Sequence, residues 1–145
     1  MQFGFGIPQK KKIGKGVVVL VGIANEDKWE DCEWILRKTF NTRLLSNDEG
    51  KQWTTNVLDN NYDVLFVSQF TLLVDASRRK KPSFSRALPP QEAKGMYEKF
   101  VEKAKEEYGG KGGGLIEDGE FGAMMDVSIE NDGPVTIIVD SKNKS

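Results

Sequence analysis

The chain has 145 residues, of which 38% are hydrophobic and 30% are charged, and its formal net charge is −1. This length corresponds to one domain with a single core. The sequence has no apolar run long enough to span a bilayer and no signal-peptide pattern at its start. It therefore predicts a soluble, cytoplasmic protein with no membrane partner, and the near-zero net charge gives no overall sign of a nucleic-acid partner.

The absence of histidine excludes Ser-His-Asp triads, Cys-His pairs and histidine-ligated zinc sites. The single cysteine, Cys32, excludes an internal disulfide and a multi-thiolate metal site. Cys32 also falls on the apolar face of an expected helix, which favours a buried thiol over a nucleophile. We expect no metal and no cofactor. Any catalysis must therefore come from carboxylates, lysines, hydroxyls, backbone groups or the substrate.

The first expected elements are a buried strand over residues 15–23 and a helix after it. The strand is a continuous apolar run bounded by glycines. Asn25 or Asp27 is expected to cap the helix. Its apolar face follows a spacing of i, i+3, i+7 and i+11, with Trp29, Cys32, Leu36 and Phe40.

Residues 64–74 form the most informative stretch, because eight of the eleven are apolar and many are β-branched or aromatic. This composition predicts one strand buried on both faces. Ser68, Gln69 and Thr71 interrupt it, and buried polar groups need partners. These side chains either bond to the nearby backbone or present donors and acceptors to a ligand.

Two basic clusters stand out in a chain of nearly neutral charge. They are Lys10, Lys11, Lys12 and Lys15, and then Arg78, Arg79, Lys80 and Lys81. The second cluster belongs to a loop over residues 75–82 that begins where the 64–74 strand ends. Each cluster is either a solvated loop or a contact surface for phosphates.

The remaining pattern completes an α+β domain with a mixed sheet and two main helices. A turn over 46–50 leads to a strand around Trp53, and Pro89-Pro90 opens a second helix that Gly109-Gly110 ends. Residues 121–129 alternate in polarity as a strand does, and a last strand covers 135–139. We expect one domain over residues 1–145.

Two separated motifs resemble those of D-aminoacyl-tRNA deacylases. Residues 68–72 read SQFTL, and residues 131–136 read NDGPVT, which fits the family pattern NxGPxT. Residues 82–87 and 119–123 are also similar to the family. The resemblance runs from about residue 13 to residue 141, and two motifs in the right order are far more specific than SQFTL alone.

The resemblance implies a curled, barrel-like sheet and hydrolysis of the ester between tRNA and a D-amino acid or glycine, a chiral proofreading reaction in translation. It also implies a homodimer whose active sites lie at the subunit interface. The alternative is a non-catalytic nucleic-acid-binding relative of the same fold, and the intact motifs favour the enzyme.

By the same resemblance, Gly133-Pro134 is expected to be a cis peptide whose two carbonyls lie beside the substrate α-carbon in the partner's pocket. They would bind the α-amino group and leave no room for an L side chain, whereas glycine would be accepted. The plainer alternative is an ordinary turn between two strands, which this sequence would also form.

The resemblance assigns the catalytic region to Ser68, Gln69, Phe70 and Thr71. Ser68 and Gln69 would hold the ribose and the ester, and backbone N–H groups near Phe70 and Thr71 would stabilise the oxyanion. The ribose 2′-hydroxyl would help to activate the water. Thr71 has no evident base beside it, so positioning is favoured over nucleophilic attack.

Three other features complete the expected tRNA site. Phe121 and Met125 would line the adenine pocket, although core packing is an alternative for both. The loop with Arg78, Arg79, Lys80 and Lys81 would contact acceptor-stem phosphates. Residues 1–12 depart from the family, because they are shorter and lack the arginine that braces the Gly-Pro turn. This difference bears on the N-terminal part of the sheet, on dimer packing and on activity.

Overall fold

The computed structural model describes residues 10–110 and 114–144, and its elements alternate between strands and helices. In chain order they are β1 (Gly16–Val21), α1 (Trp29–Asn41), β2 (Asp63–Ser68), a 3₁₀ helix (Phe70–Leu73), α2 (Pro90–Tyr108) and β3 (Ile116–Asp118). The N-terminal residues 1–9, most of the segment predicted to be atypical, lie outside the described residues.

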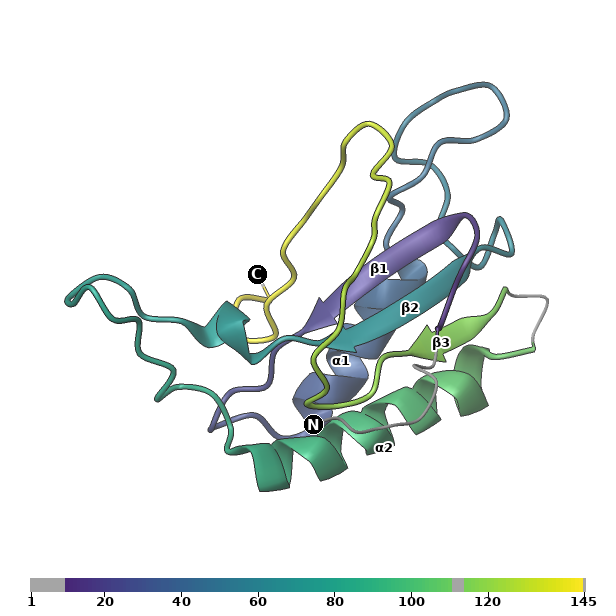
Figure 1. Cartoon of the computed structure of the whole chain (residues 1–145). Coiled ribbons are helices and arrows are strands. Elements are labelled where there is room, and N and C mark those ends of the chain that lie inside the picture. Colours follow the sequence, from purple (N-terminus) through teal and green to yellow (C-terminus); the bar gives the residue numbers. More distant parts are fainter. Residues whose placement is uncertain (1–9, 111–113, 145) are drawn as a thin grey trace.

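The three strands form one parallel sheet in the order β1-β2-β3. Each parallel pair is joined through a helix, since α1 connects β1 to β2 and α2 connects β2 to β3. Both helices cover the same face of the sheet (Figure 1). Because the strands are parallel, their carboxyl ends lie at the same end of the sheet, where the chain leaves β2 and β3.

The core lies between the sheet and the two helices. Phe66 of β2 is fully buried and packs edge-on against Phe100 of α2, with 5.2 Å between ring centroids. Tyr97 of α2 is 1% exposed, and its hydroxyl donates a hydrogen bond of 3.1 Å to the Phe66 carbonyl. Burial raises the pKa of Tyr97, so this hydroxyl stays protonated and remains a donor.

The α+β class and the two helices are confirmed, and the start of the first helix differs from the prediction. Lys28 is the N-cap residue, and its backbone N–H donates to the Asp31 carboxylate at 2.8 Å. Asp27 instead accepts a hydrogen bond from the Ala24 N–H. Cys32 is buried as predicted, and desolvation raises the pKa of its thiol to about 11, which keeps it protonated.

One predicted strand is shorter than expected, and another is not formed. The strand expected over 64–74 ends at Ser68, because the backbone turns at Gln69 into the 3₁₀ helix. No strand forms around Trp53, which is 55% exposed and has a positive φ of 62°. Only an isolated bridge between Leu45 and Thr55 pairs that loop with itself.

The expected strands over 121–129 and 135–139 are also not formed. These residues are extended, but no ladder pairs them with another strand in the part of the chain that the structure describes. The first half runs out across the sheet face opposite the helices, and the second half returns beside β1, past the edge of the sheet, as Figure 1 shows in green to yellow. The sheet of the described residues is therefore open and wholly parallel, rather than mixed and barrel-like, because a strand needs a hydrogen-bonded neighbour.

We refer to residues 120–140 as the extended arm. Along it the described side chains are exposed except for the half-buried Phe121. No helix among residues 10–110 and 114–144 combines the length and the apolar character that crossing a bilayer requires.

Candidate active site

The turn at the carboxyl end of β2, residues 68–71, is fixed by its packing against β1. The Gln69 N–H donates to the Val21 carbonyl at 2.8 Å and extends the parallel ladder by one bond. A Cβ atom on Gly22 would come within 2.7 Å of the Leu73 side chain. Glycine at this position thus lets the 3₁₀ helix pack closely against the end of β1.

The side chains of this turn are largely open to solvent. Ser68 and Gln69 are half-buried, and Phe70 and Thr71 are exposed, Phe70 by 58%. The Gln69 amide donates a short hydrogen bond of 2.5 Å to the Thr71 hydroxyl. Phe70 and Thr71 open the 3₁₀ helix, and the first N–H groups of a helix have no acceptor within it. The turn therefore offers an amide, two hydroxyls and backbone donors.

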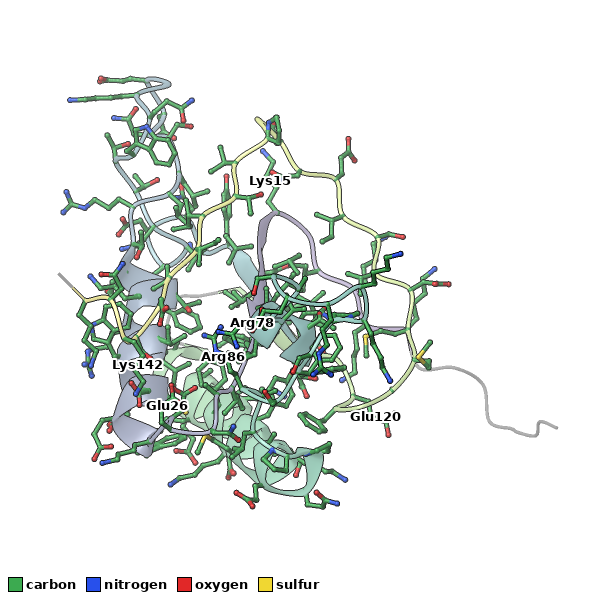
Figure 2. All side chains as sticks on the ribbon, turned by 90° about the vertical axis from the view of Figure 1, so that its left-hand side faces the viewer. Lys15, Glu26, Arg78, Arg86, Glu120 and Lys142 are labelled. Atoms are coloured by element: carbon green, nitrogen blue, oxygen red, sulfur yellow. The ribbon has the colours of Figure 1, made fainter. Side chains whose placement is uncertain are left out.

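A basic hairpin follows the turn, and it is the loop predicted over residues 75–82. The backbones of Asp75 and Ser83 exchange two hydrogen bonds, of 2.8 and 2.9 Å, which close its base. Hydrogen bonds from the Ser77 hydroxyl and N–H lower the pKa of Asp75. Figure 2 looks onto this side of the molecule and labels Arg78. A shallow hollow in the hairpin is lined by Asp75, Arg78, Arg79, Lys81 and Ser83.

Further contacts hold the hairpin against the body of the protein. The Phe70 and Phe84 rings pack edge to face, with 5.1 Å between their centroids. The Asn25 side chain donates to the Ser85 carbonyl at 2.7 Å, and its N–H donates to the Arg86 carbonyl at 3.0 Å. The local sequence predicts Asn25 only as a helix cap, whereas its partners lie about 60 residues away, beyond the reach of any local pattern.

Phe121 and Met125 lie at the carboxyl end of β3. The Phe121 ring is tilted against Tyr97, with 5.8 Å between centroids, and Phe121 packs against the core. Met125 is 41% exposed, and its sulfur would contact a Cβ atom on Gly119 at 3.2 Å. The Gly119 N–H donates a hydrogen bond to the Phe66 carbonyl of β2. Phe121 and Met125 therefore lie at the same end of the sheet as the turn at 68–71. Phe121 has a core contact, and Met125 offers an accessible thioether.

The Gly133-Pro134 peptide bond is cis, and it belongs to an exposed turn of the extended arm. Gly133 has a φ of 125°, a conformation that favours glycine. The Asn131 side chain spans this turn, since its Oδ1 accepts from the Val135 N–H and its Nδ2 donates to the Thr136 hydroxyl, both at 3.0 Å.

One chain does not bring all the candidate residues together. Residues 68–71, the basic hairpin, Phe121 and Met125 all follow the carboxyl ends of the strands. The turn of the extended arm lies at its far end, well away from the basic hairpin (Figure 1). In the described part of the chain, no group of three or more Asp, Glu, Cys or His side chains is arranged to hold a metal ion.

Sequence comparison identifies the family of this chain. Residues 8–140 match the profile of the family described as D-Tyr-tRNA(Tyr) deacylase. The chain belongs to this family. It is a family of hydrolases, and the match covers both motifs found in the sequence, 68–72 and 131–136.

Several relatives align over most of the chain. It is 46% identical over 131 residues to a D-aminoacyl-tRNA deacylase of Thermosipho melanesiensis, covering 90% of this chain and 84% of that protein. It is 46% identical over 134 residues to a D-aminoacyl-tRNA deacylase of Dictyostelium discoideum, covering 92% and 86%. The human D-aminoacyl-tRNA deacylase 1 is 43% identical over 136 residues, and this alignment covers 94% of the chain but only 63% of the human protein.

A solved structure shares the fold. The protein titled c-Myc DNA Unwinding Element Binding Protein superposes with a TM-score of 0.80 at 44% identity, and the match covers 86% of this chain and 81% of that one. The deacylase family membership predicted from SQFTL and NxGPxT is thereby confirmed.

Proposed function

We propose that this protein hydrolyses the ester bond of D-aminoacyl-tRNA and of glycyl-tRNA, releasing tRNA and the free amino acid. The observation that carries the proposal is the match of residues 8–140 to the deacylase family, with both motifs intact. The exposed turn at 68–71 supports it, because its donors are accessible to a large substrate. Since charged tRNA is the substrate, we expect the protein to act in the cytoplasm.

The ester would be held at the carboxyl end of β2. Ser68 and Gln69 would bind the ribose and the ester, while the N–H groups of Phe70 and Thr71 would stabilise the oxyanion. The Gln69 amide donates to the Thr71 hydroxyl, and an amide cannot remove a proton from it. Thr71 would therefore position the substrate, and the ribose 2′-hydroxyl would help to activate the attacking water.

Selection by handedness would come from Gly133 and Pro134. Their main-chain oxygens would bind the α-amino group and close the space that an L side chain needs. Within one chain this turn lies far from residues 68–71, which supports a homodimer whose active site is completed by the partner (Figure 1). A second copy would supply the missing half of each site.

The rest of the tRNA end would be bound by neighbouring groups of the same chain. Met125 offers an exposed thioether and Phe121 a half-buried ring for the terminal adenine. The basic hairpin would contact phosphates through Arg78, Arg79, Lys80 and Lys81. Phosphate contacts suffice, because the proposed discrimination concerns the amino acid rather than the tRNA sequence.

The test compares three esters on the same tRNA under single-turnover conditions. We expect rapid release of a D-amino acid and of glycine, and release of the L enantiomer slower by about a hundredfold or more, because the exclusion is steric. The rate without protein serves as the baseline for each ester. Equal rates for both enantiomers would contradict selection by handedness, and tRNA binding without any hydrolysis would favour the non-catalytic alternative.

A further inference from the structure

The turn of the extended arm carries its own clamp. Asn131 Oδ1 accepts a hydrogen bond from the Val135 N–H, and Asn131 Nδ2 donates to the Thr136 hydroxyl, each at 3.0 Å. The two bonds close a loop around residues 132–134 from a single side chain. An asparagine amide can do this because it presents an acceptor and a donor in one plane.

The clamp matters because the body of the protein gives this turn little support. All residues from 126 to 139 are exposed, and none belongs to a strand of the sheet. The turn also has little room for a side chain at Gly133, since a Cβ atom there would lie 3.0 Å from the Val135 side chain. In the described chain, the shape of this turn is thus defined locally.

We propose that Asn131 is a positioning residue. It fixes the turn that carries the main-chain oxygens of Gly133 and Pro134, and it thereby sets the D/L selectivity of the deacylase. The inference rests on the proposed function and deepens it. Thr136 acts as the second point of the same clamp, through its hydroxyl.

The physical reason is that exclusion by main-chain atoms works only if those atoms stay in place. A turn that can move aside by about 1 Å would admit an L side chain, whereas binding of the D ester would change less. Loss of the clamp should therefore act on the rate for the wrong enantiomer more than on the rate for the right one. A residue needed only for folding would lower both rates together.

The test uses variants that separate the hydrogen bonds from the volume of the side chain. Asn131→Leu has a similar size and removes both bonds. Asn131→Asp keeps an acceptor for the Val135 N–H and accepts from the Thr136 hydroxyl, so it should preserve the clamp. Thr136→Val removes one bond only. Asn47→Leu is the matched control, because Asn47 Oδ1 accepts two backbone N–H groups in a remote loop.

Single-turnover rates on D- and L-aminoacyl-tRNA give the D/L ratio for each variant. We expect the ratio to fall about tenfold or more in Asn131→Leu and less in Thr136→Val, and to change less than about threefold in Asn131→Asp and Asn47→Leu. Amide hydrogen exchange at Val135 should accelerate in Asn131→Leu and not in Asn47→Leu, which reports the clamp without an activity assay.

The outcomes are distinguishable. If the wild type hydrolyses the D ester and Asn131→Leu keeps the wild-type D/L ratio, the positioning role is overturned and the proposed function stands. Equal losses of both rates in Asn131→Leu and Asn131→Asp also overturn it. If the wild type hydrolyses neither ester, the proposed function fails, and this inference fails with it.

Discussion

At the scale of single residues, Thr71 shows how neighbours limit the chemistry of a hydroxyl. Its Oγ1 accepts a hydrogen bond from the Gln69 amide. A hydroxyl becomes a nucleophile when a base removes its proton, and the chain has no histidine to serve as that base. The arrangement therefore orients the hydroxyl rather than activating it.

We expect Thr71→Ala to keep substantial hydrolysis of D-aminoacyl-tRNA, with a rate loss of about tenfold or less, because only a positioning contact is removed. Thr71→Ser, which keeps the hydroxyl, should stay close to the wild type. Single-turnover rates measure both variants. Loss of all activity in Thr71→Ala, with rescue by serine, would instead identify Thr71 as the nucleophile.

At the scale of elements, the C-terminal segment is attached to the start of α1. The Lys142 amine lies 3.1 Å from one carboxylate oxygen of Asp31 and 3.7 Å from Asp27 (Figure 2 labels Lys142). The Lys144 amine lies 5.6 Å from the centre of the Trp34 ring. These contacts anchor the returning half of the extended arm, which has no strand pairing of its own in the described residues.

This attachment should make stability depend on acid pH through Asp31. The Lys28 N–H and then Lys142 lower the pKa of Asp31 to about 2 in the folded protein, below the ordinary value of 3.8. A carboxylate with a lowered folded pKa stabilises the fold above its unfolded pKa, and this stabilisation is lost as the pH falls from about 4 to about 2. Asp31→Asn should therefore lower the melting temperature by a few degrees at pH 7 and have little effect near pH 2.

Thermal melts of Asp31→Asn at several pH values measure this effect. Asp48→Asn is the control, because Asp48 is exposed in a turn remote from Asp31 and Lys142. The explanation would be wrong if the difference between Asp31→Asn and the wild type stayed constant between pH 7 and pH 2.

At the scale of the whole molecule, apolar side chains are distributed unevenly. The core side of the sheet is covered by two helices, whereas the extended arm crosses the opposite side with many apolar residues in contact with solvent (Figure 1). Within the arm, the four most exposed of these side chains are those of Met124, Ile129, Ile137 and Ile138. A surface of this kind is typical of an interface.

We expect the protein to sediment as a dimer, at twice the 16.3 kDa of one chain. Ile138 is 93% exposed, so Ile138→Asp should leave the fold of one chain intact and should weaken association about tenfold or more if the arm packs on a partner. Sedimentation velocity over a range of concentrations measures this, with Gln52→Asp as a control in a remote exposed loop. A wild type that is monomeric at every concentration would contradict the proposed dimer.

Local patterns in the sequence determined the helices, β1, the burial of Cys32 and the family. The apolar spacing of 29–40 and the proline at the start of α2 act within a few residues of the chain, and the two motifs identify the deacylases without any coordinates. The cis Gly133-Pro134 bond, expected from the family, is present in the structure.

Tertiary structure alone decided where strands end and which side chains meet. The 64–74 run is mostly apolar and resembles one long strand, but the neighbouring strand β1 ends at Val21, and the ladder stops one residue beyond Ser68. The sequence predicts strands over 121–129, which alternate in polarity, and over 135–139, but neither forms in the described chain, because a strand requires a paired neighbour that no local pattern can supply. The contacts from Asn25 to Ser85, which follows the basic hairpin, and from Lys142 to Asp31 of α1 join residues 60 and 111 positions apart, so only the folded chain could reveal them.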